Sequence, residues 1–340
     1  MVADLPRVGA NLFDHPMYGV VSQSARPLPH ATKNHGEAQG LLNSGSGGWA
    51  LLDQNRTAGE NIMAEVIVVT GASRGADKGI AIALGEAGAT VYVTGRSQSG
   101  DSPHGGTIAE TAALVTETGG KGIPVAVDHG DDEAVAALFA RVAEEQGRLD
   151  ILVNNAAKVI GTPRPVGFWE KPLETADLIT VGLRSHYVAS YNAAPLLIAN
   201  GRGLIVNTGH YGAVSYHYSP AYGAQKAGAD KMAADMAKEL RPHNVAVISI
   251  WMGGLDTERS RDYIASLPPD QRPTGRRESP RYTGRVIAAL YAGDVMRYSG
   301  RALIGAELGA HLGVTDVDGA APRSHRYELG GPPELHPSLC

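Results

Sequence analysis

Tyr222 and Lys226 are the residues of this chain whose types and spacing most clearly suggest chemistry. They lie four residues apart in an Ala-rich segment, so on a helix their side chains share one face, a turn apart. An ammonium group beside a phenol stabilises the phenolate, and such a phenol can pass a proton to or from a carbonyl or alcohol oxygen. The pair therefore predicts general acid/base chemistry, with Tyr222 as the acid/base and Lys226 as the group that tunes it.

A glycine-rich segment lies far upstream of this pair, directly after the β-branched run Val66–Val69. A glycine-rich turn between a strand and a helix lets backbone N–H groups approach a pyrophosphate at the positive end of the helix. In this context the segment predicts a dinucleotide-binding loop rather than an ordinary tight turn. The loop residues expected at the cofactor are Thr70, Gly71, Ser73, Arg74, Gly75 and Ala76.

Two arginines bear on the choice of dinucleotide. Arg96 follows the second expected strand, where an NAD enzyme places a carboxylate against the ribose 2′-hydroxyl, and Arg74 lies in the glycine-rich loop. A 2′-phosphate could thus be met by two guanidinium groups. This favours NADP(H) over NAD(H); the alternative is that both arginines are solvated surface residues.

From Met63 onward, short β-branched runs alternate with longer Ala-rich segments, which is the pattern of βαβ units. The expected strands are residues 66–69, 90–93, 122–127, 151–153, 204–207, 245–251 and 302–304, and the expected helices are 80–87, 107–116, 133–145, 176–199 and 221–240. The sequence predicts an α/β fold: a Rossmann-type, doubly wound parallel sheet of seven strands in a single domain, residues 63–340, with an irregular tail from about residue 320. Residues 1–62 show no such period and are expected to form a poorly ordered N-terminal extension.

Composition and charge exclude several classes of protein. Hydrophobic residues make up 43% of the chain, enough for a large core and too many for wholesale disorder, and a net charge of −5 gives no electrostatic footprint for nucleic acid. The single cysteine, Cys340, excludes an internal disulfide framework. No secretory signal or membrane-spanning stretch is visible, so we expect a cytoplasmic protein. His210 and His217 have no further ligand at metal-binding spacing, so no metal is expected.

Taken together, these features resemble the short-chain dehydrogenase/reductase superfamily, and most of all its branch of dehydrogenase/reductase family member one. The motifs that carry the resemblance are residues 70–75, Asp128, residues 154–157, the Tyr222–Lys226 pair and, for the branch, residues 182–187, 251–257 and 316–319. The resemblance implies NADP(H)-dependent interconversion of a small-molecule carbonyl and an alcohol by hydride transfer. It also places Asp128 near the adenine, Asn155 near the ribose and Thr257 near the nicotinamide amide. By the same resemblance, the chain forms a homodimer or homotetramer through its two long helices.

Three positions depart from the pattern of that superfamily. Its third loop glycine is Asp77 here, whose carboxylate could cap the helix but would repel a pyrophosphate, so weaker cofactor binding is expected. Its catalytic serine, thirteen residues before the tyrosine, falls on Gly209, and its asparagine in the middle helix falls on Gly182. Loss of the serine removes a hydrogen-bond donor to the substrate oxygen, worth roughly 2.7–4 kcal/mol in comparable sites.

Three readings of the missing serine stay open. His210 or Thr208 takes over the donor role, or the enzyme works slowly on an activated carbonyl with Tyr222 alone. In the third reading, the chain is a non-catalytic NADP(H)-binding protein with a regulatory or scaffolding role. The nearby Tyr211, Tyr216, His217 and Tyr218 either line a substrate pocket or pack within a loop or subunit contact, and residues 259–281 suit a mobile flap over the site.

The N-terminal extension carries a second resemblance. Residues 4–16 and 34–42, within the segment 1–55, are similar to an internal stretch of the glucose–methanol–choline oxidoreductases. No Gly-x-Gly-x-x-Gly occurs before residue 62, so this fragment cannot build a flavin site. It is interpreted as a fusion remnant or as an extension ahead of a native start at Met63.

Overall fold

The computed structural model describes residues 65–99, 105–158 and 166–336. The predicted N-terminal extension, its oxidoreductase-like fragment and Met63 lie outside these residues. Seven strands form one sheet: β1 (Val66–Val69), β2 (Thr90–Gly95), β3 (Lys121–Ala126), β4 (Ile151–Asn154), β5 (Gly203–Gly209), β6 (Val245–Trp251) and β7 (Ala302–Ile304). The α-helices are α1 (Gly75–Glu86), α2 (Ile108–Glu117), α3 (Asp132–Gln146), α4 (Asp177–Thr180), α5 (Arg184–Ala199), α6 (Pro220–Leu240), α7 (Glu258–Ser266), α8 (Pro280–Ala292), α9 (Gly305–His311) and α10 (Arg326–Leu329).

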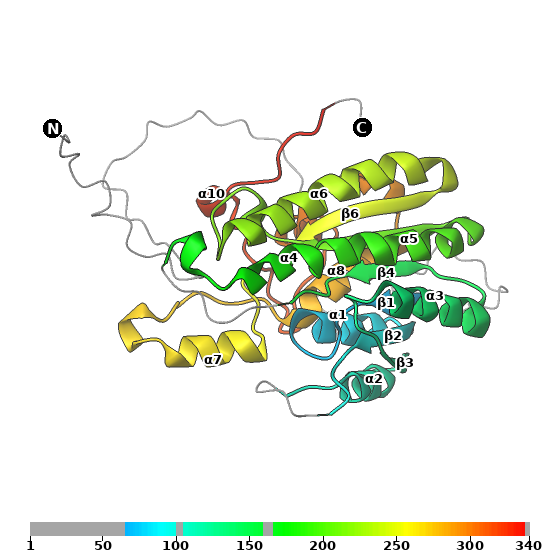
Figure 1. The fold of residues 1–340 in the computed structure, drawn as a ribbon, viewed down its shortest axis with the longest axis horizontal. Coiled ribbons are helices and arrows are strands. Elements are labelled where there is room, and N and C mark those ends of the chain that lie inside the picture. The colour runs from blue at the N-terminus through cyan, green and yellow to red at the C-terminus, as the bar shows by residue number, and fades with distance from the viewer. Residues whose placement is uncertain (1–64, 100–104, 159–165, 337–340) are drawn as a thin grey trace, which may run out of the picture.

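The strands follow the order β3-β2-β1-β4-β5-β6-β7, and every pairing is parallel. The order reverses between β1 and β4, so the loops that leave these two strands run to opposite sides. This divergence opens a crevice at the carboxyl ends of the strands, where open α/β sheets bind their ligands. The predicted Rossmann-type sheet of seven strands is confirmed (Figure 1).

Alternate residues of each strand pack into two separate hydrophobic cores, one on each face of the sheet, because side chains along a strand point to opposite faces with a period of two. In β1, Ile67 and Val69 join the core under α1, α2 and α8, while Val66 and Val68 join the core under α3, α5 and α6. Both faces of β1 are therefore buried, which explains why its sequence is continuously apolar rather than alternating.

Helices α1 and α8 approach until their backbones touch, and two glycines make this possible. A Cβ atom on Gly79 would lie 2.3 Å from the carbonyl carbon of Pro280, and one on Gly284 would lie 2.7 Å from the carbonyl oxygen of Ile80. This close contact fixes the position of α1, the helix whose N-terminus faces the crevice.

The middle helix differs from the prediction. The expected helix 176–199 is broken into α4 and α5, with Gly182 at the break. A Cβ atom on Gly182 would lie 2.4 Å from the carbonyl oxygen of Leu178 and 2.4 Å from Nε2 of Gln225, which donates to the Gly182 carbonyl at 3.2 Å. The tight packing at this break leaves no room for the asparagine that the resemblance would place there.

Helix α7 covers the start of residues 259–281, the segment expected to form a mobile flap, and neither it nor α8 and α9 was predicted as a helix. In Figure 1, α7 and α10 both lie on the left side of the view. Beyond residue 320 the described chain is irregular apart from the single turn of α10, which is tied to α9 by the ion pair of Arg326 with Glu307. Strand β3 begins and ends one residue earlier than expected.

Candidate active site

A cleft of about 430 Å³ opens where β1 and β4 diverge. It is bounded by the loop that enters α1, the ends of β2 and β4, and the start of α7. Nine of the residues expected at a cofactor line it: Gly71, Ser73, Arg74, Gly75, Ala76, Arg96, Asp128, Asn155 and Thr257. The cleft is also lined by His129, Lys158 and Glu258, which were not predicted although each directly follows or neighbours a predicted residue.

The glycine-rich loop is shaped as a cradle. Gly71 and Gly75 have φ angles of +81° and +66°, a region that favours glycine, and a Cβ on Gly71 would lie 3.0 Å from Cα of Ala156. Thr70 is buried rather than exposed to the cleft, and its hydroxyl accepts hydrogen bonds from the backbone N–H groups of Asn155 at 3.0 Å and Ala156 at 3.1 Å. Thr70 thus ties the loop after β4 to the loop after β1.

Asp77 occupies the first turn of α1 but does not cap it; the N-cap residue is Arg74. The Asp77 side chain is buried, hydrogen-bonded to Asn155, and its Oδ1 has no partner in the described part of the chain. Burial raises the pKa of this carboxyl well above its usual value, although Asn155 and the charge of Lys226 act in the opposite direction. Burial therefore favours the protonated form, which would repel a pyrophosphate less than a carboxylate.

Arg74 and Arg96 converge on the end of β2. Nη2 of Arg74 donates to the Ser97 hydroxyl at 2.6 Å and to the Gly106 carbonyl at 3.2 Å, which holds its guanidinium beside the residues that follow β2. Arg96 is exposed and lies 3.7 Å from the equally exposed carboxylate of Asp128. An exposed pair of this kind contributes little to stability, so the Arg96 guanidinium is available to another anion.

Tyr222 and Lys226 lie on one face of α6, as predicted. Ser219 caps this helix by accepting from the Tyr222 N–H at 3.2 Å, and Nζ of Lys226 stands 5.7 Å from the centre of the Tyr222 ring. Lys226 is buried and donates to the Thr208 carbonyl oxygen at 2.9 Å. Burial lowers the pKa of Lys226 to about 8, while the carboxyl groups of Asp230 and Asp77 oppose the shift.

The space beside Gly209 is filled by a tryptophan. Gly209 pairs with Trp251 of β6, and a Cβ on Gly209 would lie 2.3 Å from Cδ1 of that indole ring. The indole Nε1 donates to both carboxylate oxygens of Asp230, at 2.9 and 3.1 Å. Asp230 lies one turn beyond Lys226 on α6. The missing serine is thus part of a local repacking in which Trp251 occupies the volume of a side chain at position 209.

The two candidate substitutes for that serine have different environments. The Thr208 hydroxyl is fully buried and donates to Oδ1 of Asn155 and, at 3.3 Å, to the Asn154 carbonyl, so it points into the interior. The His210 ring packs edge-on against Tyr222, with 5.7 Å between ring centres, and its Nδ1 accepts from the Gly212 N–H at 3.0 Å. His210 thus contacts the ring of the predicted acid/base, whereas the Thr208 hydroxyl is engaged by Asn154 and Asn155.

The aromatic run divides between core and site. Tyr211 is buried against Trp251 and its hydroxyl accepts from the His325 N–H at 3.0 Å, so it packs in the core. His217 and Tyr218 contact the rings of His210 and Tyr222, with ring centres 4.7 and 4.9 Å apart. Tyr216 is 75% exposed.

Across residues 65–99, 105–158 and 166–336, His, Cys, Asp and Glu side chains do not gather in any group of three that could hold a metal ion. None of the helices in those same ranges combines the length and apolar character that a membrane crossing requires.

A Rossmann-type sheet with a glycine cradle at its switch point is the architecture of a dinucleotide-binding protein. Residues 65–266 match the short chain dehydrogenase family, and the chain belongs to that family of oxidoreductases, which use nicotinamide cofactors. It is 38% identical over 280 residues to mouse "Dehydrogenase/reductase SDR family member 1", covering 78% of this chain and 87% of that protein. Identity to the human protein of the same name is 39% over 269 residues, covering 75% and 84%. A crystal structure of a short chain dehydrogenase from Mycobacterium thermoresistibile superposes with a TM-score of 0.62 at 25% identity, covering 74% of this chain and 89% of that one.

Proposed function

We propose that this protein interconverts a carbonyl compound and an alcohol with NADP(H), using Tyr222 as the general acid/base. The observation that carries the proposal is the placement of Lys226, whose buried ammonium lies 5.7 Å from the Tyr222 ring centre and is held by the Thr208 carbonyl. A positive charge at this place stabilises the phenolate that remains after proton transfer.

The bound nicotinamide would supply or accept the hydride. In the direction of reduction, the Tyr222 hydroxyl gives its proton to the substrate oxygen, and the Lys226 ammonium stabilises the resulting phenolate. Lys226 itself is kept in place by its hydrogen bond to the Thr208 carbonyl, and Ser219 fixes the start of the helix that bears both residues.

His210 is the proposed second donor to the substrate oxygen. Burial, together with the charges of His217 and Lys226, lowers the pKa of His210 well below its usual value, so the imidazole is neutral at physiological pH. Because Nδ1 accepts from the Gly212 N–H, the proton of the neutral ring is assigned to Nε2. Nε2–H is then a neutral donor beside Tyr222, the type of group that the absent serine would supply.

The preference for NADP(H) is supported by the two arginines at the end of β2. Arg74 is anchored by its hydrogen bond to Ser97, and Arg96 has only the exposed carboxylate of Asp128 within ion-pair distance in the described structure. A 2′-phosphate would gain charge-assisted hydrogen bonds from both. Exchange of Arg96 for Ser is expected to weaken binding of NADPH about tenfold and to leave that of NADH nearly unchanged, measured by calorimetric titration.

The acid/base role is tested by reducing a panel of ketones and aldehydes with NADPH. Tyr222→Phe removes the hydroxyl and keeps the ring, and we expect kcat to fall by about 10²–10⁴-fold while the Kd of NADPH stays within twofold. Tyr216→Phe, at an exposed tyrosine of the same segment, is the matched control and should match the parent protein. Equal turnover by parent and Tyr222→Phe would rule the assignment out.

A second candidate function is NADP(H) binding without turnover. The observation that favours it is the tight packing of Trp251 over Gly209, which leaves no room for the family's serine. Tight NADPH binding with no oxidation across the carbonyl panel would support this alternative, and Tyr222-dependent turnover would exclude it.

A homodimer or homotetramer through α5 and α6 is part of the proposal. Helix α5 exposes two aromatic side chains one turn apart, Tyr187 by 54% and Tyr191 by 71%, which offers an apolar surface for a second copy of the chain. Sedimentation should give a mass of two or four chains, and Tyr191→Glu should shift it towards one.

A further inference from the structure

The N–H group of Gly75 is already engaged by a carboxylate. It donates to Oε2 of Glu258 at 3.2 Å, and Glu258 comes from the first turn of α7, 183 residues further along the chain. Gly75 and Glu258 both line the cleft, and Glu258 is half-buried there. A carboxylate from the first turn of α7 therefore lies in the cradle of the glycine-rich loop.

This N–H group begins helix α1, which is 12 residues long. The first N–H groups of a helix have no partner within the helix and carry a partial positive charge, so they attract anions. In a strand–glycine loop–helix unit these are the groups that a dinucleotide pyrophosphate approaches. One anion on the Gly75 amide excludes another, because the amide has a single hydrogen to donate.

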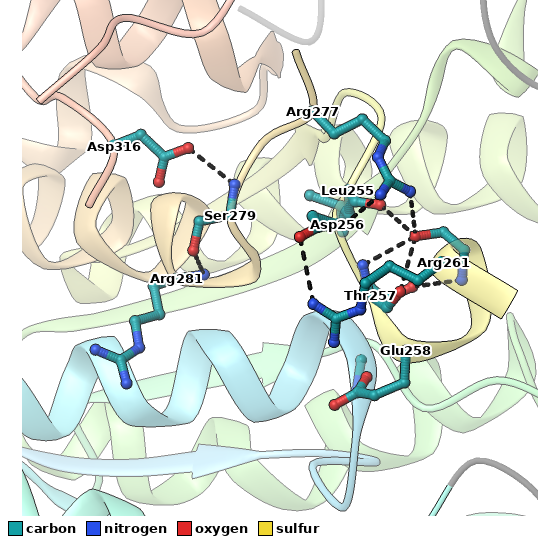
Figure 2. A network of polar contacts seen from close by, with 11 residues as sticks. Leu255, Asp256, Thr257, Glu258, Arg261, Arg277, Ser279, Arg281 and Asp316 are labelled. Carbon is teal, nitrogen blue, oxygen red and sulfur yellow. Dashed lines mark hydrogen bonds and ion pairs between the residues drawn. The ribbon is translucent and has the colours of Figure 1, made fainter. Parts of the chain in front are cut away.

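The base of α7 is anchored independently of Glu258. Ser260 and Thr257 cap the helix reciprocally, and Arg277 donates to the Ser260 hydroxyl at 2.9 Å and pairs with Asp256. Figure 2 shows this network, with the Glu258 side chain pointing away from it. The Glu258 carboxylate can consequently leave Gly75 by rotating about its own side-chain bonds, while α7 stays in place.

We propose that Glu258 is a negative determinant of cofactor affinity: its carboxylate holds the Gly75 amide, and a dinucleotide binds only after its pyrophosphate displaces that carboxylate. The inference rests on the proposed function, because it assigns a role within the same cofactor cleft. Since the pyrophosphate is common to both dinucleotides, the effect of Glu258 is the same for NADPH and NADH. This separates Glu258 from Arg96, which bears on the 2′-phosphate alone.

The test measures the Kd of NADPH and of NADH by calorimetric titration of the full chain. Glu258→Ala removes the contact and the charge, and both Kd values should fall about tenfold, which corresponds to about 1.4 kcal/mol. Glu258→Gln keeps the shape and a neutral acceptor, so both values should fall by a smaller factor. Asp262→Asn removes one negative charge from an exposed position of the same helix, outside the cleft lining, and should leave both values within twofold of the parent.

A second readout needs no cofactor. In the absence of dinucleotide, hydrogen exchange of a peptide spanning residues 70–80 should be faster in Glu258→Ala than in the parent, because the Gly75 amide loses its acceptor.

The outcomes separate this inference from the proposed function. If the parent binds NADPH, and Glu258→Ala binds each dinucleotide as tightly as the parent does or more weakly, the inference is wrong and the proposed function stands. If a change occurs for NADPH alone, the carboxylate does not compete with the pyrophosphate, and the inference is again wrong. If neither protein binds any dinucleotide, both the inference and the proposed function fail.

Discussion

Restoring the family's serine by Gly209→Ser is expected to damage this protein rather than to improve it. The new Cβ would lie 2.3 Å from Cδ1 and 2.9 Å from Nε1 of Trp251, whereas carbon atoms in contact are normally about 3.5–4.0 Å apart. The indole must therefore move by more than about 1 Å. It is fully buried, and its Nε1 is held by two hydrogen bonds to Asp230, so any movement also strains that contact.

Overpacking of this kind costs about 1–3 kcal/mol. For a domain of this size each kcal/mol lowers Tm by about 2–4 °C, so Gly209→Ser should melt roughly 2–12 °C below the parent. Because Asp230 lies beside Lys226, a displaced indole also disturbs the carboxyl group that favours the Lys226 ammonium. We thus expect no gain in kcat despite the added hydroxyl.

The assay is thermal and urea denaturation, with ketone reduction measured on the same samples. Gly275→Ser is the matched control, since a Cβ at Gly275 meets no atom within 4 Å, and it should melt within about 1 °C of the parent. In a Trp251→Ala background the added cost of Gly209→Ser should shrink, because the clashing ring is gone. A Gly209→Ser variant that is as stable as the parent, or more active, would refute this reasoning.

Four further predictions follow from the site and the core. Because burial lowers the pKa of Lys226 to about 8, the rate of carbonyl reduction should fall as the pH rises through about 8. Lys226→Arg should not show this fall in its pH profile, and an unchanged fall would mean that another group titrates there. His210→Ala should lower kcat about 10²–10³-fold with a smaller effect on the Kd of NADPH, and steady-state kinetics showing an unchanged kcat would remove His210 from the mechanism. Gly79→Ala should destabilise the fold by about 1–3 kcal/mol in urea denaturation, because its methyl group meets the Pro280 backbone, and wild-type stability would contradict the backbone contact. Burial raises the pKa of Glu278 from 4.5 to about 7, so the folded state binds the proton more tightly than the unfolded state, and the parent loses stability as the pH rises from 4.5 through 7. Between pH 5 and pH 8 the free energy of unfolding of Glu278→Gln should therefore fall less than that of the parent, and an equal fall in both proteins would count against this.

Much of the fold was readable from the sequence because both faces of the sheet are buried. Strands such as β1 are then continuous apolar runs, and the helices between them are long and Ala-rich, so each element leaves a local signal. The same signal is absent from α7, which is charged and mostly exposed, so no helix was predicted in residues 259–281, which were expected to form a mobile flap. The break at Gly182 was also missed, because it depends on Gln225 of another helix.

The candidate site likewise has features that local sequence patterns predicted and features that depend on tertiary contacts. The spacing of Tyr222 and Lys226 and the glycine-rich loop are local patterns, since one helix face and one turn suffice to define them. Asp77, in the first turn of α1, was noticed in the sequence, but burial raises the pKa of its carboxyl well above the usual value, and the sequence did not indicate that burial. Burial depends on tertiary contacts, so the residues adjacent to Asp77 in the sequence do not indicate it.

The sequence by itself determined the individual strands, the glycine-rich loop that opens α1 and the shared helix face of Tyr222 and Lys226, because each is encoded by residues within a few positions of one another. Only the tertiary structure decided that Trp251 fills the place of a side chain at Gly209, and that Glu258 reaches the Gly75 amide. Both contacts join residues that are distant along the chain, 42 and 183 positions apart. Packing of the parallel sheet and anchoring of α7 bring those residues together, and neither leaves a pattern in the local sequence.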